Sequence, residues 1–182
     1  MCNAYRFKQS LDRLAETFGA LHLPLQWAGG APNLEPRDPV RPTEPAPVIV
    51  GSPEGAELKQ LRWGFSQPKG GPVINFRSEG RRFPNGRCLI PADGFYEFTG
   101  DKTPKSKWLF TTPEEDILCI AGLVRDDRFT MLTMAPGPDI APYHNRQIAI
   151  LPRAQWAEWL GPDADVAIPS LPAGSLKVTQ VR

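Results

Sequence analysis

Cys2, which directly follows the first methionine, has the most distinctive chemistry in this chain. A residue this small allows Met1 to be removed, and the new terminus would then carry an α-amine and a thiol on adjacent carbons. Both groups keep a reactive fraction near neutral pH, since their reference pKa values are roughly 7.7–8.0 and roughly 8.5. The amine can form a Schiff base with an aldehyde, and the thiol can then close onto the imine carbon to give a thiazolidine ring. The alternative is an incidental cysteine at a frayed end.

Polar side chains alternate in the segment from Val73 to Glu79. In a strand, Asn75, Arg77 and Glu79 share one face, because successive side chains point to opposite sides. This pattern predicts either an anion-binding groove or a solvent-facing strand edge.

Two titratable residues are candidates for proton transfer. Glu97 stands between Tyr96 and Phe98, and aromatic neighbours can raise a carboxyl pKa by desolvation; the alternative is an exposed glutamate. His144 lies in a loop before a predicted strand, where catalytic histidines are often found. Arg146, two residues later, can bind a phosphate bidentately.

The elements that must position these residues are mostly strands. Helices are predicted at Ser10–Phe18 and Pro152–Leu160 from their apolar periodicity. A proline-rich segment, Pro24–Pro53, is expected to be an ordered loop that leads into a strand at Val48–Val50. Further strands are predicted at Leu58–Phe65, Pro72–Phe76, Arg87–Ile90, Gly94–Phe98, Lys107–Thr111, Ile117–Val124, Phe129–Met134, Gln147–Leu151 and Leu176–Val181. The expected fold is a single α+β domain over residues 1–182, a mostly antiparallel, barrel-like sheet with a few short helices.

The segment from Arg87 to Phe98 contains an apolar strand, a Pro-Ala-Asp-Gly turn and an aromatic strand. This order predicts a hairpin-like unit. Cys88 within it is expected to be a buried apolar residue and not a second nucleophile.

Composition bounds the class of protein. The chain has 182 residues, which is the length of one globular domain, and its net charge is +1. From Lys59 to Lys107 there are ten basic and four acidic residues. A local basic surface of this kind could attract a polyanion, but taken alone the charge pattern favours a solvated face. The three cysteines show no zinc spacing, and no cofactor motif, signal peptide or membrane span is found, so we expect a cytoplasmic protein without metal or cofactor.

Taken together, the motifs resemble those of the SRAP (SOS response-associated peptidase) family, whose members are also described as abasic-site processing proteins. The resemblance covers nearly the whole chain. The segments that carry it are Met1-Cys2, Pro32-Asn33-Leu34-Glu35-Pro36, Val40-Arg41-Pro42-Thr43, Arg62-Trp63-Gly64, Asn75-x-Arg77-x-Glu79, Arg87 through Glu97, and His144-x-Arg146.

The resemblance implies a protein that traps abasic sites in single-stranded DNA, including single-strand/duplex junctions, as a thiazolidine crosslink through Cys2. It implies that Asn75 holds the terminus and the sugar, that Glu97 transfers protons beside the Schiff base, and that His144 assists ring opening. The implied DNA contacts are Arg77, Arg146, Trp63, Pro36 and Thr133. Autocatalytic removal of Met1 and a lyase activity are also implied. We further expect a monomer that joins the nucleoid when bound to damaged DNA.

The chain also departs from the family pattern. Asn3-Ala4 replace the usual Gly-Arg, so one phosphate contact is missing, and the segment after Trp63-Gly64 is shortened. Gly80 stands where threonine is common, and Gln147-Ile148 replace Met-Pro. These changes bear on DNA affinity and structural preference, since none touches Cys2, Asn75, Glu97 or His144.

Two alternative functions remain. One is a thiol peptidase that acts on other proteins, with Cys2 and His144 as a nucleophile–base pair. The other is a non-catalytic module that binds single-stranded DNA by phosphate contact and base stacking, with Cys2 incidental.

Overall fold

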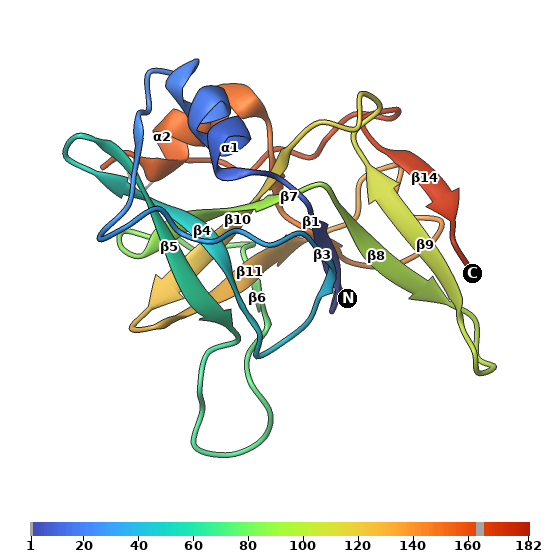
Figure 1. Cartoon of the computed structure of the whole chain (residues 1–182). Coiled ribbons are helices and arrows are strands. Elements are labelled where there is room, and N and C mark those ends of the chain that lie inside the picture. The colour runs from blue at the N-terminus through green and yellow to red at the C-terminus, as the bar shows by residue number, and fades with distance from the viewer. Residues whose placement is uncertain (1, 163–165) are drawn as a thin grey trace.

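Two β-sheets carry most of the chain in the computed structural model, which describes residues 2–162 and 166–182 (Figure 1). The small sheet has the order β14-β9-β8-β1-β3, and its strands are β1 (Tyr5–Phe7), β3 (Arg37–Val40), β8 (Gly94–Thr99), β9 (Ser106–Thr111) and β14 (Lys177–Gln180). The large sheet has the order β12-β11-β10-β7-β4-β5-β2. Its strands are β2 (Leu25–Gln26), β4 (Pro45–Ser52), β5 (Gly55–Trp63), β7 (Arg87–Ala92), β10 (Leu118–Arg125), β11 (Arg128–Met134) and β12 (Gln147–Ile148), with β6 (Asn75–Arg77) paired to β11 and β13 (Ile150–Leu151) paired to β10.

The large sheet closes on itself into a ring. Strand β5 pairs antiparallel with β4 and also parallel with β11, so the path β11-β10-β7-β4-β5 returns to its start. Strand β7 lies within this ring and is buried along its whole length, which explains its nearly continuous apolar sequence. The expected curled sheet is therefore present in ring-like form, although parallel pairs make it mixed.

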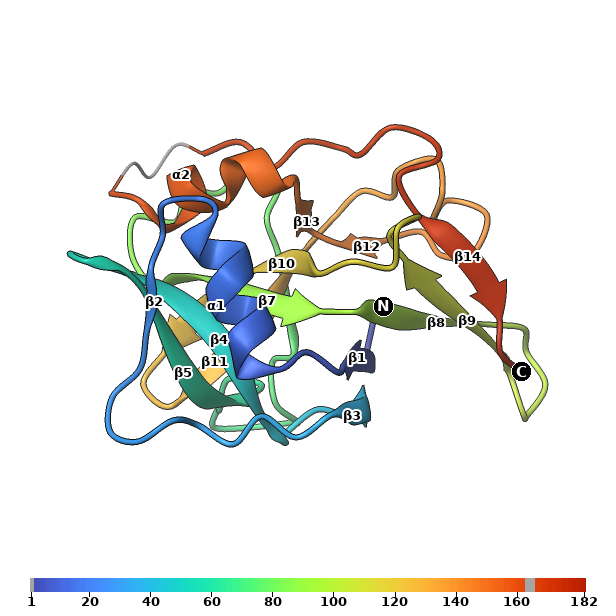
Figure 2. The ribbon, with the colours of Figure 1, turned by 45° about the horizontal axis from the view of Figure 1, so that its top comes forward.

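The helices lie together on one side of the large sheet (Figures 1 and 2). Helix α1 (Leu11–Gly19) begins after Ser10, whose side chain accepts a hydrogen bond from the Arg13 amide, as is usual for an N-cap. Helix α2 (Trp156–Leu160) follows a 3-10 turn at Arg153–Gln155. Phe18 of α1 stacks on Trp156 of α2 with ring centroids 5.2 Å apart, so the predicted helical faces do bury their aromatic residues.

The predicted hairpin at Arg87–Phe98 is wrong. Strand β7 pairs with β10 and β4 in the large sheet, whereas β8 pairs with β1 and β9 in the small sheet. The chain crosses between the sheets at Asp93, whose carboxylate accepts hydrogen bonds from the Lys8 amide and the Gln9 side chain. Gly94 is needed at this crossing because a Cβ there would lie 2.6 Å from the Phe110 carbonyl oxygen.

The proline-rich segment also differs from its prediction. Instead of a loop up to Val48, it contains β2, β3 and the start of β4. Strand β3 includes Pro39 and forms the edge of the small sheet beside β1. An edge strand tolerates proline because it does not need every amide hydrogen bond.

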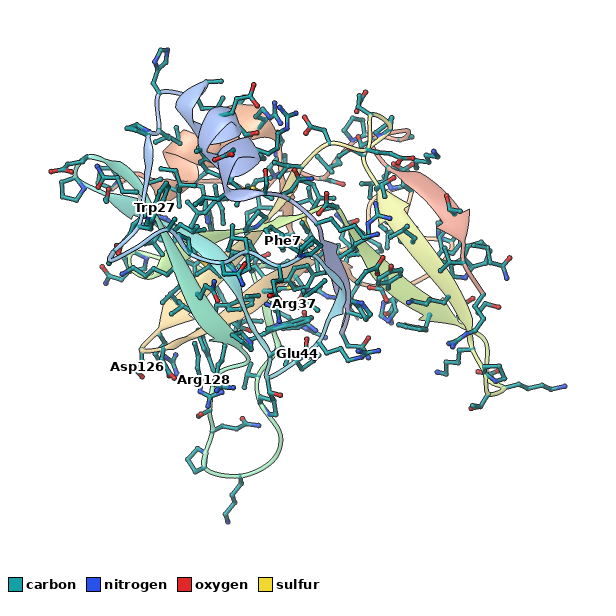
Figure 3. All side chains as sticks on the ribbon, viewed as in Figure 1. Phe7, Trp27, Arg37, Glu44, Asp126 and Arg128 are labelled. Atoms are coloured by element: carbon teal, nitrogen blue, oxygen red, sulfur yellow. The ribbon has the colours of Figure 1, made fainter. Side chains whose placement is uncertain are left out.

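Aromatic side chains fill the space between the sheets. The Trp63 ring stacks on Phe129, with centroids 6.3 Å apart, and meets Tyr5 edge to face at 5.4 Å. Phe7 points into the same interior, while Asp126 and Arg128 lie at the tip of the β10–β11 hairpin (Figure 3). None of the helices in the described ranges combines the length and apolar character needed to cross a membrane.

Candidate active site

Cys2, Asn75 and Glu97 come together where the N-terminal segment joins the small sheet. The Ala4 carbonyl oxygen accepts a hydrogen bond from the Tyr96 amide (3.0 Å) and from the Cys2 thiol (3.3 Å). The Asn75 side-chain amide donates to the Cys2 carbonyl oxygen at 2.9 Å. The segment before β1 thus runs beside β8, the strand that carries Glu97, and is tied to β6 of the other sheet.

Burial sets the protonation states of the Cys2 thiol and the Glu97 carboxyl. Burial, together with the negative charge of the nearby Glu97, raises the pKa of the Cys2 thiol to about 12. Burial also raises the pKa of the Glu97 carboxyl to about 7, because a charged carboxylate loses its hydration there. At neutral pH the thiol is therefore protonated, while Glu97 is divided between its acid and its base form and can both donate and accept a proton.

Asn75 keeps an open hydrogen-bond acceptor beside Cys2. Its strand β6 runs parallel to β11, with Asn75 opposite Met131. The Asn75 Oδ1 atom is buried and accepts no hydrogen bond within residues 2–162 and 166–182. Buried polar atoms are normally satisfied, so this oxygen is suited to receive a donor from a bound molecule.

His144 lies in the loop next to this group, on the side of β9. Its neighbour Tyr143 packs on Trp108, with centroids 4.8 Å apart, and Trp108 is the cross-strand partner of Glu97. The His144 Nδ1 atom accepts the Arg146 amide at 3.0 Å, so in the neutral ring the proton resides on Nε2. Burial lowers the pKa of His144, which favours this neutral form.

Arg146 is held in a network of side chains. Its guanidinium makes a bidentate pair with Glu79, with Nη2–Oε2 at 2.9 Å, and Nη2 also lies 3.1 Å from Thr133 Oγ1. The hydrogen bonds from Arg146 lower the pKa of Glu79 to about 2. Thr133 is buried, so the predicted contacts Arg146 and Thr133 are engaged with protein groups in this state, while Arg77 on β6 is exposed.

The structure places Trp63 in the core, although the sequence predicted a DNA contact. Its side chain is fully buried, and its Nε1–H donates to the Ile74 carbonyl oxygen at 2.9 Å. Trp63 therefore supports the strand that carries Asn75. Sequence reasoning missed this role, because nothing in the sequence around Trp63 indicates it. Pro36 is exposed in the segment before β3.

Not all of the basic and aromatic side chains between Lys59 and Lys107 are available to a ligand. Arg87 is buried and donates to main-chain oxygens, including that of Trp159 at 2.8 Å, and Phe65 is also buried. Phe76 and Phe83 are half-buried, and the Arg81 guanidinium lies 4.7 Å above the Phe76 ring. Across the described part of the chain, no three His, Cys, Asp or Glu side chains gather to hold a metal ion.

Comparison with known proteins places this architecture in a family. Residues 1–181 match the family described as SOS response associated peptidase (SRAP). The chain belongs to this family.

The relatives include two proteins of Bacillus subtilis strain 168. Abasic site processing protein YobE is 29% identical over 147 residues, which covers 68% of this chain and 67% of the relative. Abasic site processing protein YoaM is 27% identical over 152 residues, covering 70% and 67%.

Solved structures share the fold. A crystal structure of a protein from Bordetella bronchiseptica aligns with a TM-score of 0.77 at 22% identity, covering all of both chains. A protein from Bacteroides thetaiotaomicron aligns with a TM-score of 0.77 at 15% identity, covering all of this chain and 92% of the other.

Proposed function

We propose that this protein processes abasic sites in single-stranded DNA by trapping the sugar aldehyde on Cys2. The contact of Cys2 with Asn75, beside a buried Glu97, carries this proposal. The names of the Bacillus relatives point to the same class of lesion. Removal of Met1, which lies outside the described residues, would create the α-amine that the reaction needs.

The proposed steps balance without a cofactor. The Cys2 amine adds to C1′ of the ring-opened deoxyribose, and the resulting carbinolamine loses water after a proton passes from Glu97 to its hydroxyl. The Cys2 sulfur then adds to the carbon of the protonated imine, which leaves the ring nitrogen neutral, and the thiol proton passes to the Glu97 carboxylate and restores its acid form. Asn75 Oδ1 accepts a hydrogen bond from the terminus or the sugar, and the His144 Nε2–H assists ring opening at the sugar oxygen.

The protonated thiol argues against a peptidase that acts on other proteins. Such an enzyme needs a thiolate, whereas burial raises the pKa of the Cys2 thiol to about 12. An amine-first reaction with a small aldehyde does not need a thiolate at the start. The exposed Arg77 and Pro36 are the proposed DNA contacts that the structure leaves accessible, and single-strand/duplex junctions, a monomeric state and nucleoid association belong to this proposal.

The test is denaturing-gel crosslinking to a single-stranded oligonucleotide with one abasic site. Mass spectrometry must first show that the protein begins at Cys2. A heat-stable shift with the wild type, absent with Cys2→Ala and absent on undamaged DNA, is the expected result.

One further variant and two further readouts separate the remaining functions. Cys2→Ser keeps the amine and should form a Schiff base that borohydride traps but heat reverses. Binding without any crosslink would identify a non-catalytic module, and cleavage of an unrelated protein substrate would favour the peptidase.

A further inference from the structure

A basic pocket adjoins the N-terminal segment on the small sheet, outside the group of Cys2, Asn75 and Glu97. It has a volume of about 380 Å³, and the residues that line it are Asn3, Ala4, Pro39, Arg41, Pro42, Phe98, Lys107 and Arg182. Three of these side chains are cationic, and none of the lining side chains from the described ranges is a carboxylate. We propose that this pocket binds a backbone phosphate of the single-stranded DNA that the proposed function places at Cys2.

Residues that line the pocket directly follow Cys2 and Glu97 in the sequence. Asn3 and Ala4 directly follow Cys2, and Phe98 directly follows Glu97. Strand β8 continues antiparallel to this segment, since Tyr5 pairs with Phe95 and the Tyr96 amide donates to Ala4. Because successive side chains of a strand point to opposite faces, Phe98 and Lys107 project from the face opposite to Glu97. The proposal therefore requires that the DNA strand beyond the abasic sugar turn past Asn3 and Ala4 to reach the pocket.

Lys107 is held in place for this role. It pairs with Phe98 across β8 and β9, and its ammonium lies 3.7 Å from the centroid of the Tyr96 ring. A cation over an aromatic face is fixed without losing its charge. No carboxylate in the described residues forms a salt bridge with Lys107, so its charge stays available to an anion.

Arg41 and Arg182 approach from two other segments. The Arg41 main-chain amide donates to Glu44 at 2.9 Å, which fixes the turn after β3, while the side chain is exposed. Two main-chain hydrogen bonds pin Arg182 to Lys107, with Lys107 N to Arg182 O at 2.9 Å.

Two carboxylates next to this arrangement, Asp38 and Glu44, already have cationic partners, since Glu44 lies 3.9 Å from an Arg37 nitrogen. Asp38 directly precedes Pro39. It accepts the Tyr96 hydroxyl, and it lies 3.3 Å from the Lys8 ammonium. Cationic residues from three segments thus line one pocket beside the small side chain of Ala4, although the Arg182 Nε–H also donates to the Lys105 carbonyl oxygen at 3.2 Å. Pro39, Pro42 and Phe98 supply apolar surface for the sugar. Phosphate and sugar contacts of this kind position a strand without reading its sequence.

The experiment measures affinity without chemistry. The probe is a fluorescein-labelled single-stranded oligonucleotide with one tetrahydrofuran residue, an abasic analogue that has no aldehyde. Lys107→Gln and Arg41→Gln should each raise Kd about three- to tenfold, and each should reduce the slope of log K against log salt by roughly 0.7, the value for one phosphate contact on a single strand. Lys177→Gln is the control, because it removes the same charge from the same sheet but lies in a surface pair with Glu115.

A second arm locates the phosphate. Replacing one linkage at a time by an uncharged methylphosphonate should weaken wild-type binding most at one position near the lesion. In Lys107→Gln that position should no longer matter. Equal losses with Lys107→Gln and Lys177→Gln, or an unchanged methylphosphonate profile, would overturn the pocket as a phosphate site.

The two proposals fail separately. If the wild type binds the analogue through Lys107 but forms no crosslink with a true abasic site, the proposed function is wrong and the phosphate site stands. If crosslinking depends on Cys2 while the Lys107 and Arg41 variants bind like the wild type, only the phosphate site is lost.

Discussion

At the scale of single residues, burial decides what the site can do. The same removal from water that keeps the Cys2 thiol protonated moves the pKa of Glu97 to about 7. In the proposed reaction these two groups would act as the nucleophile and the proton relay.

The raised pKa of Glu97 makes stability depend on pH. The pKa of the Glu97 carboxyl rises from its ordinary value of 4.5 to about 7 in the folded protein, which therefore binds this proton more tightly than the unfolded chain. The stability linked to Glu97 is thus complete below about pH 4.5 and is lost as pH rises through 7. Glu97→Gln removes this loss. Relative to the wild type, the variant should gain stability between pH 5 and pH 8, by at most about 3 kcal/mol, since one pKa unit is worth about 1.4 kcal/mol.

Urea unfolding of both proteins at several pH values measures this difference. A difference that stays constant from pH 5 to pH 8 would mean that Glu97 titrates normally in the folded protein. A matched Glu158→Gln variant on α2, where the side chain is exposed, controls for the loss of a carboxylate.

At the scale of elements, the site depends on a crossing between sheets. Glu97 is carried by β8 of the small sheet and Asn75 by β6, which is paired to the large sheet. The relative position of the two residues is set where the chain leaves β7 and enters β8 at Asp93-Gly94.

Gly94→Ala should therefore disturb both stability and the site. The added Cβ would meet the Phe110 carbonyl oxygen at 2.6 Å, whereas a Cβ at Gly71 meets nothing within 4 Å. We expect Gly94→Ala to cost about 1–3 kcal/mol, as overpacking does, and Gly71→Ala to stay within about 0.5 kcal/mol. Thermal unfolding compares the two, and equal midpoints would show that β8 shifts freely to accept the methyl group.

Trp63→Phe tests the support behind β6. Loss of the hydrogen bond to Ile74 and of ring volume should destabilise the protein by about 1–3 kcal/mol. Because Trp63 is buried, the affinity of the folded variant for single-stranded DNA should be unchanged. A large rise in Kd at a temperature where the variant is fully folded would instead restore Trp63 as a DNA contact.

The sequence predicted local elements better than their partners. Helix α1 and strands such as β9 and β11 lie close to their predicted bounds, because periodicity and capping are local signals. The hairpin at Arg87–Phe98 failed because a Pro-Ala-Asp-Gly turn can also carry a chain from one sheet to another. Strand β3 was missed because proline conceals an edge strand.

Part of the candidate site could be named from the sequence as well. The link between Cys2 and Asn75 was implied by family resemblance alone, since it joins residues 73 positions apart. The burial of Trp63 and Thr133 and the pairing of Arg146 with Glu79 depend on tertiary packing, which no local pattern encodes.

At the scale of the whole molecule, charge gives little long-range attraction. The net charge is +1, so the proposed binding to DNA must come from local contacts, for which Arg77 and the basic pocket are the proposed sites. We expect a log K against log salt slope of roughly −2 to −3 for a single strand, which corresponds to about three or four phosphate contacts. Titrations from 50 to 300 mM salt measure it, and a slope near zero would exclude phosphate contact as the main source of affinity.

The hydrogen bond between Cys2 and Asn75 also has a consequence in time. Asn75 is made 73 residues after Cys2, and Glu97 later still. At roughly 5–20 residues per second, a ribosome needs about 4–15 s to cover that interval. Throughout it, the nascent chain carries the cysteine without Asn75 or Glu97. An enzyme that removes Met1 during this interval therefore acts on a chain in which the other side chains of the proposed site have not yet been synthesised.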